Sequence, residues 1–167
     1  MPAAVSTFEE LSLAGLKDIY DAEHQITEAL PKMTEAATSA DLKQAFQNHL
    51  EQTRNQIKRL DQVFEHLGQK AERKPCVATK GLIAEANEHL KETEKGALRD
   101  AALIESAQKV EHYEIASYGT ARTYAKQAGQ AEVARLLEET LQEEEATDRL
   151  LTKIAESVVN PKAAAQG

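Results

Sequence analysis

Apolar residues recur in steps of three and four along four long segments of the chain. In a helix of about 3.6 residues per turn this spacing forms one apolar face, which is typical of the seam of a packed helical bundle. Pro31 lies inside the first segment, and we expect it to kink that helix or to remove one hydrogen bond. A shorter helix is expected over about residues 82–94. The long helices are predicted from Ser6 or Thr7 to about Thr38, over residues 40–67, from Ala97 to about Ala128 and from about Ala131 to Ser157.

The lengths of the connections predict how these helices are joined. Only a few residues separate the first helix from the second and the third from the fourth, so each pair forms an antiparallel hairpin. Residues 68–96 join the two hairpins and contain the short helix. One long crossover of this kind is typical of ferritin-like bundles, whereas plain up-down bundles use three short loops. We therefore predict an all-α, ferritin-like four-helix bundle, formed by a single domain over residues 1–167. Its ordered core covers about residues 6–158, and residues 160–167 are expected to be a flexible tail.

Polar residues interrupt each apolar stripe near its middle. In the second hairpin Glu114 precedes Gly129 by 15 residues and Glu144 follows it by 15, so antiparallel packing places these two at one level of the bundle. Glu111 and Asp148 match in the same way at the next level. The second hairpin therefore brings four carboxylates to one layer of the predicted interior.

The first hairpin adds polar residues to the same layer. Glu23 lies about 16 residues before Ser39, whereas His49, Gln52 and Gln56 lie 10, 13 and 17 residues after it. No lysine or arginine occupies the stripes at a matching depth. Burial of an isolated carboxylate is so unfavourable that such groups stay protonated, pair with cations or coordinate metal.

This arrangement of ligand types predicts a dinuclear metal site. Oxygen ligands with an occasional imidazole suit iron or manganese, and the facing helices of a bundle are where dinuclear carboxylate sites are built. We expect two iron ions, with manganese as an alternative. The candidate ligands are Glu23, His49, Gln52, Glu111, Glu114, Glu144 and Asp148.

Each candidate also has a simpler interpretation when taken alone. A single glutamate on a helix seam usually directs its carboxylate to solvent, and a lone histidine such as His49 is more often a hydrogen-bonded core residue. Tyr20 and Tyr118 are either packing residues with a polar tip or residues that line the site. The convergence of four helices on one layer favours the metal site over these separate interpretations.

Composition and charge exclude several classes of protein. The 167 residues carry a net charge of -8, and a chain without basic clusters is a poor match for nucleic acid, which is bound by neutralising phosphates. A single cysteine, Cys76, excludes an intramolecular disulfide framework and fits a reducing compartment. No segment approaches the roughly 20 apolar residues that span a bilayer. We therefore expect a soluble, cytoplasmic protein that binds neither nucleic acid nor membranes.

Several segments of the chain resemble one known family. These are "LKDIYDAEHQI", "HLEQTRNQIKRLDQVFEHLG", "GLIAEANE", "RDAALIESAQKVEHYEIASYGTA" and "TLQEEEATDRLL". Over about residues 8–158 the chain resembles the YciE/YciF family of bacterial ferritin-like proteins and is most similar to its YciF-type members. The resemblance implies a rubrerythrin-like bundle that is usually dimeric, has a candidate dinuclear iron site and is associated with bacterial stress responses.

The resemblance also assigns candidate ligands residue by residue. It implies that Glu23 is the first-helix glutamate of the di-iron pattern, and that Glu111 and Glu114 form the Glu-x-x-Glu of the third long helix. Glu144 corresponds to the fourth-helix glutamate, with Asp148 where rubrerythrins have histidine.

The second helix departs from the family pattern. Ferritin-like proteins usually carry Glu-x-x-His there, and this family reverses it to His-x-x-Glu, whereas this chain has His49-x-x-Gln52. A neutral amide is a weaker ligand than a carboxylate. The sequence therefore leaves open whether one or two ions bind.

Two functions follow from these observations. The first is a di-iron protein that reacts with oxygen or peroxide, with Glu114 as the bridging carboxylate. The second is a structural or interaction homodimer, without catalysis, whose site is degenerate or holds a single metal. An iron-storage cage and manganese catalase chemistry are less favoured, because the acidic surface also fits simple solubility and because His49 is the only histidine on a seam.

Overall fold

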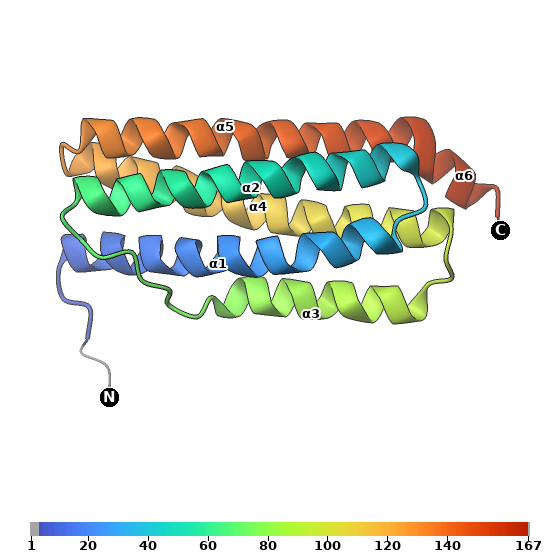
Figure 1. The fold of residues 1–167 in the computed structure, drawn as a ribbon, viewed down its shortest axis with the longest axis horizontal. Helices are drawn as coiled ribbons and strands as arrows, with labels where there is room; N and C mark the ends of the chain where they lie inside the picture. The colour runs from blue at the N-terminus through green and yellow to red at the C-terminus, as the bar shows by residue number, and fades with distance from the viewer. Residues whose placement is uncertain (1–3, 167) are drawn as a thin grey trace.

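Four long helices lie side by side in the structure, a computed structural model that describes residues 4–166 (Figure 1). They are α1 (Phe8–Ala36), α2 (Ala40–His66), α4 (Ala97–Gln127) and α5 (Ala131–Ile154). The shorter α3 (Val77–Glu92) packs along the outside of the bundle against α1 and α4. The predicted all-α, ferritin-like bundle with a short fifth helix in its crossover is confirmed.

The chain direction follows from the connections. Helices α1 and α2 form one antiparallel hairpin, and α4 and α5 form the other (Figure 1). The segment that contains α3 returns the chain to the end of the bundle where α2 began, so α2 and α4 run parallel. This arrangement brings the middles of all four long helices together.

Side-chain caps fix where the first hairpin turns. Thr7 and Glu10 form a capping box at the start of α1, which is one of the two alternatives that the sequence offered. Ser39 caps α2 by accepting a hydrogen bond from the Leu42 amide. Asp100 of α4 accepts hydrogen bonds from the Thr38 and Ser39 amides, both at 2.7 Å, and so holds this turn against the other hairpin. Helix α1 continues without interruption through its internal proline.

Two helix boundaries differ from the prediction. Helix α3 begins at Val77 rather than near residue 82, because the Cys76 thiol accepts a hydrogen bond from the Thr79 amide at the helix start. Residues 160–164, which the sequence predicts to lie in a flexible tail, have a helical conformation in the structure. Helix α5 continues through a π-helical turn, η1 (Ala155–Val159), into α6 (Asn160–Ala164). A proline in the first turn of α6 is tolerated because the amide at such a position has no helical partner. Residues 1–3 and 167 of the predicted domain lie outside the described residues.

The apolar core is divided into two clusters. One contains Leu16, Ile19, Phe64, Tyr118 and Leu137, and the other contains Leu30, Phe46, Leu103, Ile104 and Leu151. A polar layer lies between them, since Glu23 falls between the α1 residues of the two clusters. No helix within residues 4–166 has the length and apolar composition needed to cross a membrane.

Candidate metal centre

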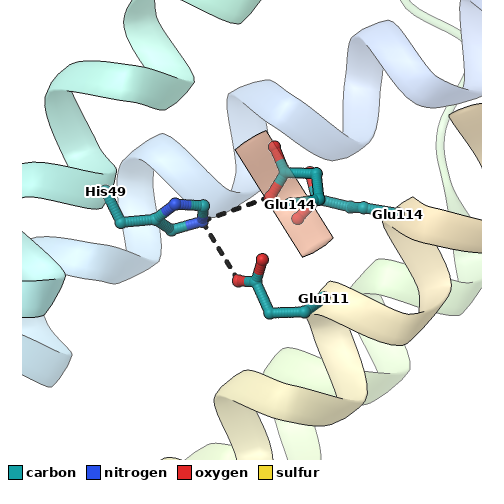
Figure 2. A group of neighbouring side chains, drawn as sticks. All are labelled: His49, Glu111, Glu114 and Glu144. Atoms are coloured by element: carbon teal, nitrogen blue, oxygen red, sulfur yellow. Dashed lines mark ion pairs between the residues drawn. The ribbon is translucent and has the colours of Figure 1, made fainter. Parts of the chain in front are cut away.

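Three glutamates and one histidine meet in this polar layer. His49 of α2, Glu111 and Glu114 of α4, and Glu144 of α5 offer ligand atoms that all lie within 4.8 Å of one another (Figure 2). None of the four residues is more than 4% exposed. The i, i+3 spacing of Glu111 and Glu114 places both on the inner face of α4.

The His49 imidazole points into the cluster. Its Nε2 atom lies 3.1 Å from Glu111 Oε1 and 3.9 Å from Glu144 Oε2, as the dashed lines of Figure 2 show. On the other side of the ring, Nδ1 lies 3.5 Å from the Thr147 hydroxyl. A metal-binding histidine commonly has such a partner on its second nitrogen, which fixes the orientation of the ring.

Glu23 joins the cluster from α1 and is fully buried. The Tyr118 hydroxyl donates a hydrogen bond to Glu23 Oε1, and the Glu23 and Glu114 carboxyls are neighbours that influence each other's pKa. Tyr118 therefore lines the site. Tyr20, the other tyrosine considered from the sequence, donates instead to Asp61, at 2.8 Å.

The cluster contains an unusual concentration of buried polar atoms without hydrogen-bond partners. More than 90% of buried polar groups in proteins are paired, so such atoms normally have an explanation. Within residues 4–166 the set comprises Glu23 Oε2, His49 Nε2, Gln56 Oε1, Glu111 Oε2, both carboxyl oxygens of Glu114, and Glu144 Oε2. These atoms converge on one layer, so a ligand bound among them would satisfy several at once.

Within the described part of the chain, no lysine or arginine pairs with the carboxyls of the cluster. The Arg59 guanidinium pairs instead with Glu139 at 3.2 Å and Glu143 at 3.0 Å and donates to Thr140. Histidine is the only basic residue type paired with the cluster glutamates. The buried charge therefore has to be neutralised by protons or by a bound cation.

Burial changes the proton affinity of these carboxyls. Burial, with the charge of Glu144, raises the pKa of Glu23 to about 8. Burial also raises the pKa of Glu111 to about 8. The pKa values of Glu114 and Glu144 are raised well above the ordinary value, first by burial and then by the neighbouring carboxylates. Without a cation, the cluster therefore retains protons at neutral pH.

The structure brings together five of the seven predicted ligands, and the other two lie apart. Gln52 is half-buried, and its side chain forms no hydrogen bond with any described residue. Asp148 is displaced towards the surface, where Gln108 Nε2 donates to it at 3.0 Å and His112 Nε2 lies 3.2 Å away.

The amide that reaches the cluster is Gln56, which the sequence placed in the same layer but did not identify as a ligand. It is fully buried and donates to Glu143 at 3.0 Å and to Glu144. The sequence did contain a signal for Gln56, since this residue belongs to the stripe of α2 that faces the core. Gln52 lies four residues away on a similar helix face, so the signal did not decide between the two amides.

The residues present fit a pair of divalent cations. The charge of two such ions is balanced by four carboxylates, those of Glu23, Glu111, Glu114 and Glu144. Gln56 is neutral and adds no negative charge to this set. Ligands on one ion with bonds of about 2.1 Å lie at most about 4.2 Å apart, so only a small contraction of the cluster is needed. Iron and manganese are the ions that this oxygen-rich set with one imidazole favours.

Comparison with known proteins places the chain in a family. Residues 7–164 match the family described as domain of unknown function DUF892. The chain belongs to this family. It is 53% identical to protein YciF of Escherichia coli strain K12 over 160 residues, which cover 95% of this chain and 96% of that protein. The resemblance identified from the sequence is thereby confirmed.

Two solved structures are similar over nearly the whole DUF892 chain. The crystal structure of the E. coli stress protein YciF aligns with a TM-score of 0.90 and 53% identity, covering 93% of this chain and 99% of that one. YcfI from Rhodopseudomonas palustris, for which a structural role is suggested, aligns with a TM-score of 0.89 and 49% identity, covering 91% and 97%. A bundle of this shape is therefore shared by relatives of this chain.

Proposed function

We propose that this protein binds two divalent metal ions, most favourably iron, and reacts with oxygen or peroxide as part of a stress response. The observation that supports the proposal is the convergence of unpartnered buried oxygens from Glu23, Glu111, Glu114 and Glu144 around His49. The stress assignment is taken from the description of the E. coli relative. A cytoplasmic homodimer remains our prediction for the location and assembly.

The roles of the residues follow from their positions. His49 would supply a nitrogen ligand and Glu111 the carboxylate beside it, while Glu114, whose neighbours include Glu23 and Glu144, would supply a further carboxylate. A pair of iron ions supplies reversible one-electron redox changes at neighbouring centres. The Tyr118 hydroxyl holds a proton at Glu23 Oε1 and fixes that carboxylate. The two apolar clusters cover the layer on both sides along the length of the bundle.

Metal content of the purified protein tests the proposal. We expect about two equivalents of iron or manganese per chain when chelators are omitted, as in other dinuclear carboxylate bundles. Glu144→Gln should lower the content, whereas Glu105→Gln, on the exposed face of α4, should not. Wild-type protein that binds no added Fe²⁺ or Mn²⁺ would rule the proposal out.

A structural role without metal is the second candidate. Protonated carboxyls can satisfy one another, since the Glu114 carboxyl neighbours that of Glu23, and the Glu144 carboxyl neighbours that of Glu111. In that case, replacing Glu111, Glu114 and Glu144 together by glutamine would leave stability unchanged or raise it in every buffer. A stabilisation by metal that the triple variant lacks would favour the dinuclear site instead.

A further inference from the structure

A cavity of about 300 Å³ lies between α3 and the bundle and extends inward to the cluster. Its walls are mostly carbon, from residues such as Leu30, Phe46, Ile83, Leu90 and Val110. Protein interiors contain few voids larger than a water molecule, and an apolar cavity of about 150 Å³ is enough to hold benzene. The space is therefore of a size that fits an organic molecule.

The two ends of the cavity differ in character. At the inner end lie His49 and Glu111, which are more than nine-tenths buried and whose Nε2 and Oε2 atoms have no hydrogen-bond partner. At the outer end lie the exposed residues Glu28 and Lys32, and Lys32 donates a hydrogen bond to Asn87 across the gap between α1 and α3. The cavity thus leads from the surface under α3 to the candidate ligands.

The lining limits what can occupy this space. Hydrated cations need polar groups along their path, so the carbon walls make this a poor route for metal ions. Dioxygen and peroxide need no cavity larger than a few water molecules. Anions are disfavoured because the inner end, formed by Glu111 with Glu144 behind it, offers carboxyls and no lysine or arginine to pair with them. A neutral, apolar molecule with one hydrogen-bond donor matches both the carbon walls and the unpartnered acceptors.

We propose that the cavity under α3 binds a neutral aromatic or short aliphatic molecule that carries a donor such as N–H or O–H, and presents that donor to His49 and Glu111. The apolar walls hold the molecule whether or not metal is bound, and in the metal-free protein His49 and Glu111 are free to receive its donor. Its assignment as the organic co-substrate of the centre rests on the proposed function.

Indole is a suitable probe, since it is neutral, planar and apolar and has one N–H donor. Calorimetric titration of the full chain with indole should give saturable binding with a stoichiometry of one. Octanoate, which is apolar but anionic, should bind more weakly to the metal-free protein. Absence of saturable indole binding, or tighter binding of octanoate, would overturn the proposal.

Two substitutions on α3 test the location of the site. Ala86 is 8% exposed and lines the cavity, whereas Ala84 lies two residues away on the exposed face of the same helix. Ala86→Phe should weaken indole binding at least about tenfold, and Ala84→Phe should leave it unchanged. If Ala86→Phe does not fold, Ala29→Phe fills the same cavity from α1. Equal binding by the filled variant and its control would contradict the assignment.

Metal analysis of the same samples distinguishes this inference from the proposed function. Both filled variants leave every candidate ligand in place, so their metal content should equal that of the wild type. Indole binding without metal binding would leave the cavity site intact and refute the dinuclear centre. Metal binding without indole binding would do the reverse.

Discussion

Replacement of Glu114 by glutamine separates the metal-free state of the cluster from the metal-bound state. Glu114 is fully enclosed, and burial followed by the charges of Glu144 and Glu23 raises its pKa well above the ordinary value. In the metal-free protein at neutral pH it is therefore a neutral carboxylic acid. Glutamine has nearly the same shape, is also neutral, and can donate a hydrogen bond to a neighbouring carboxyl oxygen as the protonated acid can. We expect the free energy of unfolding of the metal-free protein to change by no more than about 1 kcal/mol.

In the metal-bound state the same substitution removes a charged, bridging ligand. A metal present at about 100 times its dissociation constant stabilises the folded state by about 2.7 kcal/mol. For a domain of 167 residues this is a rise of about 5 to 11 °C in melting temperature. If Glu114→Gln weakens binding about 100-fold, the stabilisation at the same metal concentration falls to about 0.4 kcal/mol, or about 1 to 2 °C.

Thermal unfolding followed by circular dichroism, with EDTA or with Mn²⁺, measures both quantities in one series. Glu105→Gln is the matched control, since it makes the same change on α4 at a side chain that is 58% exposed. It should behave like the wild type with and without metal. A loss of more than about 3 kcal/mol in metal-free Glu114→Gln would show that the carboxylate is ionised and structurally paired, and would refute the reasoning. So would an equal response of variant and wild type to Mn²⁺.

Three further predictions concern protons and hydrogen bonds. The pKa values of Glu23 and Glu111 are raised from 4.5 to about 8, so between these pH values the folded metal-free protein holds more protons than the unfolded chain. Its free energy of unfolding should therefore fall as the pH rises from 4.5 to 8, by at most about 1.4 kcal/mol per pH unit for each group. Urea unfolding at several pH values measures this slope. Saturating Mn²⁺, which requires deprotonated carboxylates, should reverse that slope, and a flat profile without metal would contradict the assignment. Asp21→Ala should destabilise the protein by about 1 to 3 kcal/mol in the same assay, because Asp21 accepts hydrogen bonds from the Cys76 amide at 2.7 Å and from Arg73 at 2.8 Å. An unchanged urea midpoint would show that these hydrogen bonds contribute nothing to stability. Tyr118→Phe leaves Glu23 Oε1 without its hydrogen-bond donor and should lower the stability of the metal-free protein by a similar amount. The variant should still bind metal, because Tyr118 only positions Glu23. Complete loss of metal binding would contradict this role.

Helix periodicity was sufficient to predict the layer in which the cluster lies. An apolar stripe on a long helix faces the core, so a glutamate in the stripe starts from the face that is turned to the interior. Glu114 and Glu144 are equally distant from the turn at Gly129, and an antiparallel hairpin preserves that symmetry. For this reason the sequence alone predicted the level along the bundle at which these polar residues lie.

Side-chain direction within the layer was not predictable in the same way. Gln52 and Gln56 lie one turn apart on one face, and a small rotation or tilt of α2 decides which of them reaches Glu144. Asp148 has the right depth, but polar partners on α4, Gln108 and His112, hold it near the surface. Which side chain reaches the cluster depends on competing contacts between helices, and the periodicity of one helix does not contain this information.

The two misplaced helix boundaries have local causes. Cysteine is not among the usual capping residues, so the start of α3 at Cys76 carried no recognisable signal. Pro161 ordinarily indicates a helix end, yet a π-helical turn before it allows the backbone to continue into α6. Both cases are exceptions to sequence preferences rather than failures of periodicity.

Anomalous diffraction from crystals soaked in Mn²⁺ is the most direct test of the central claim. We predict two anomalous peaks in the buried layer, bounded by His49, Glu111, Glu114 and Glu144, with Glu23 as a further ligand. Gln52 and Asp148 should lie outside the coordination. Peaks confined to surface carboxylates, or an empty layer at a metal concentration that saturates other dinuclear sites, would contradict it.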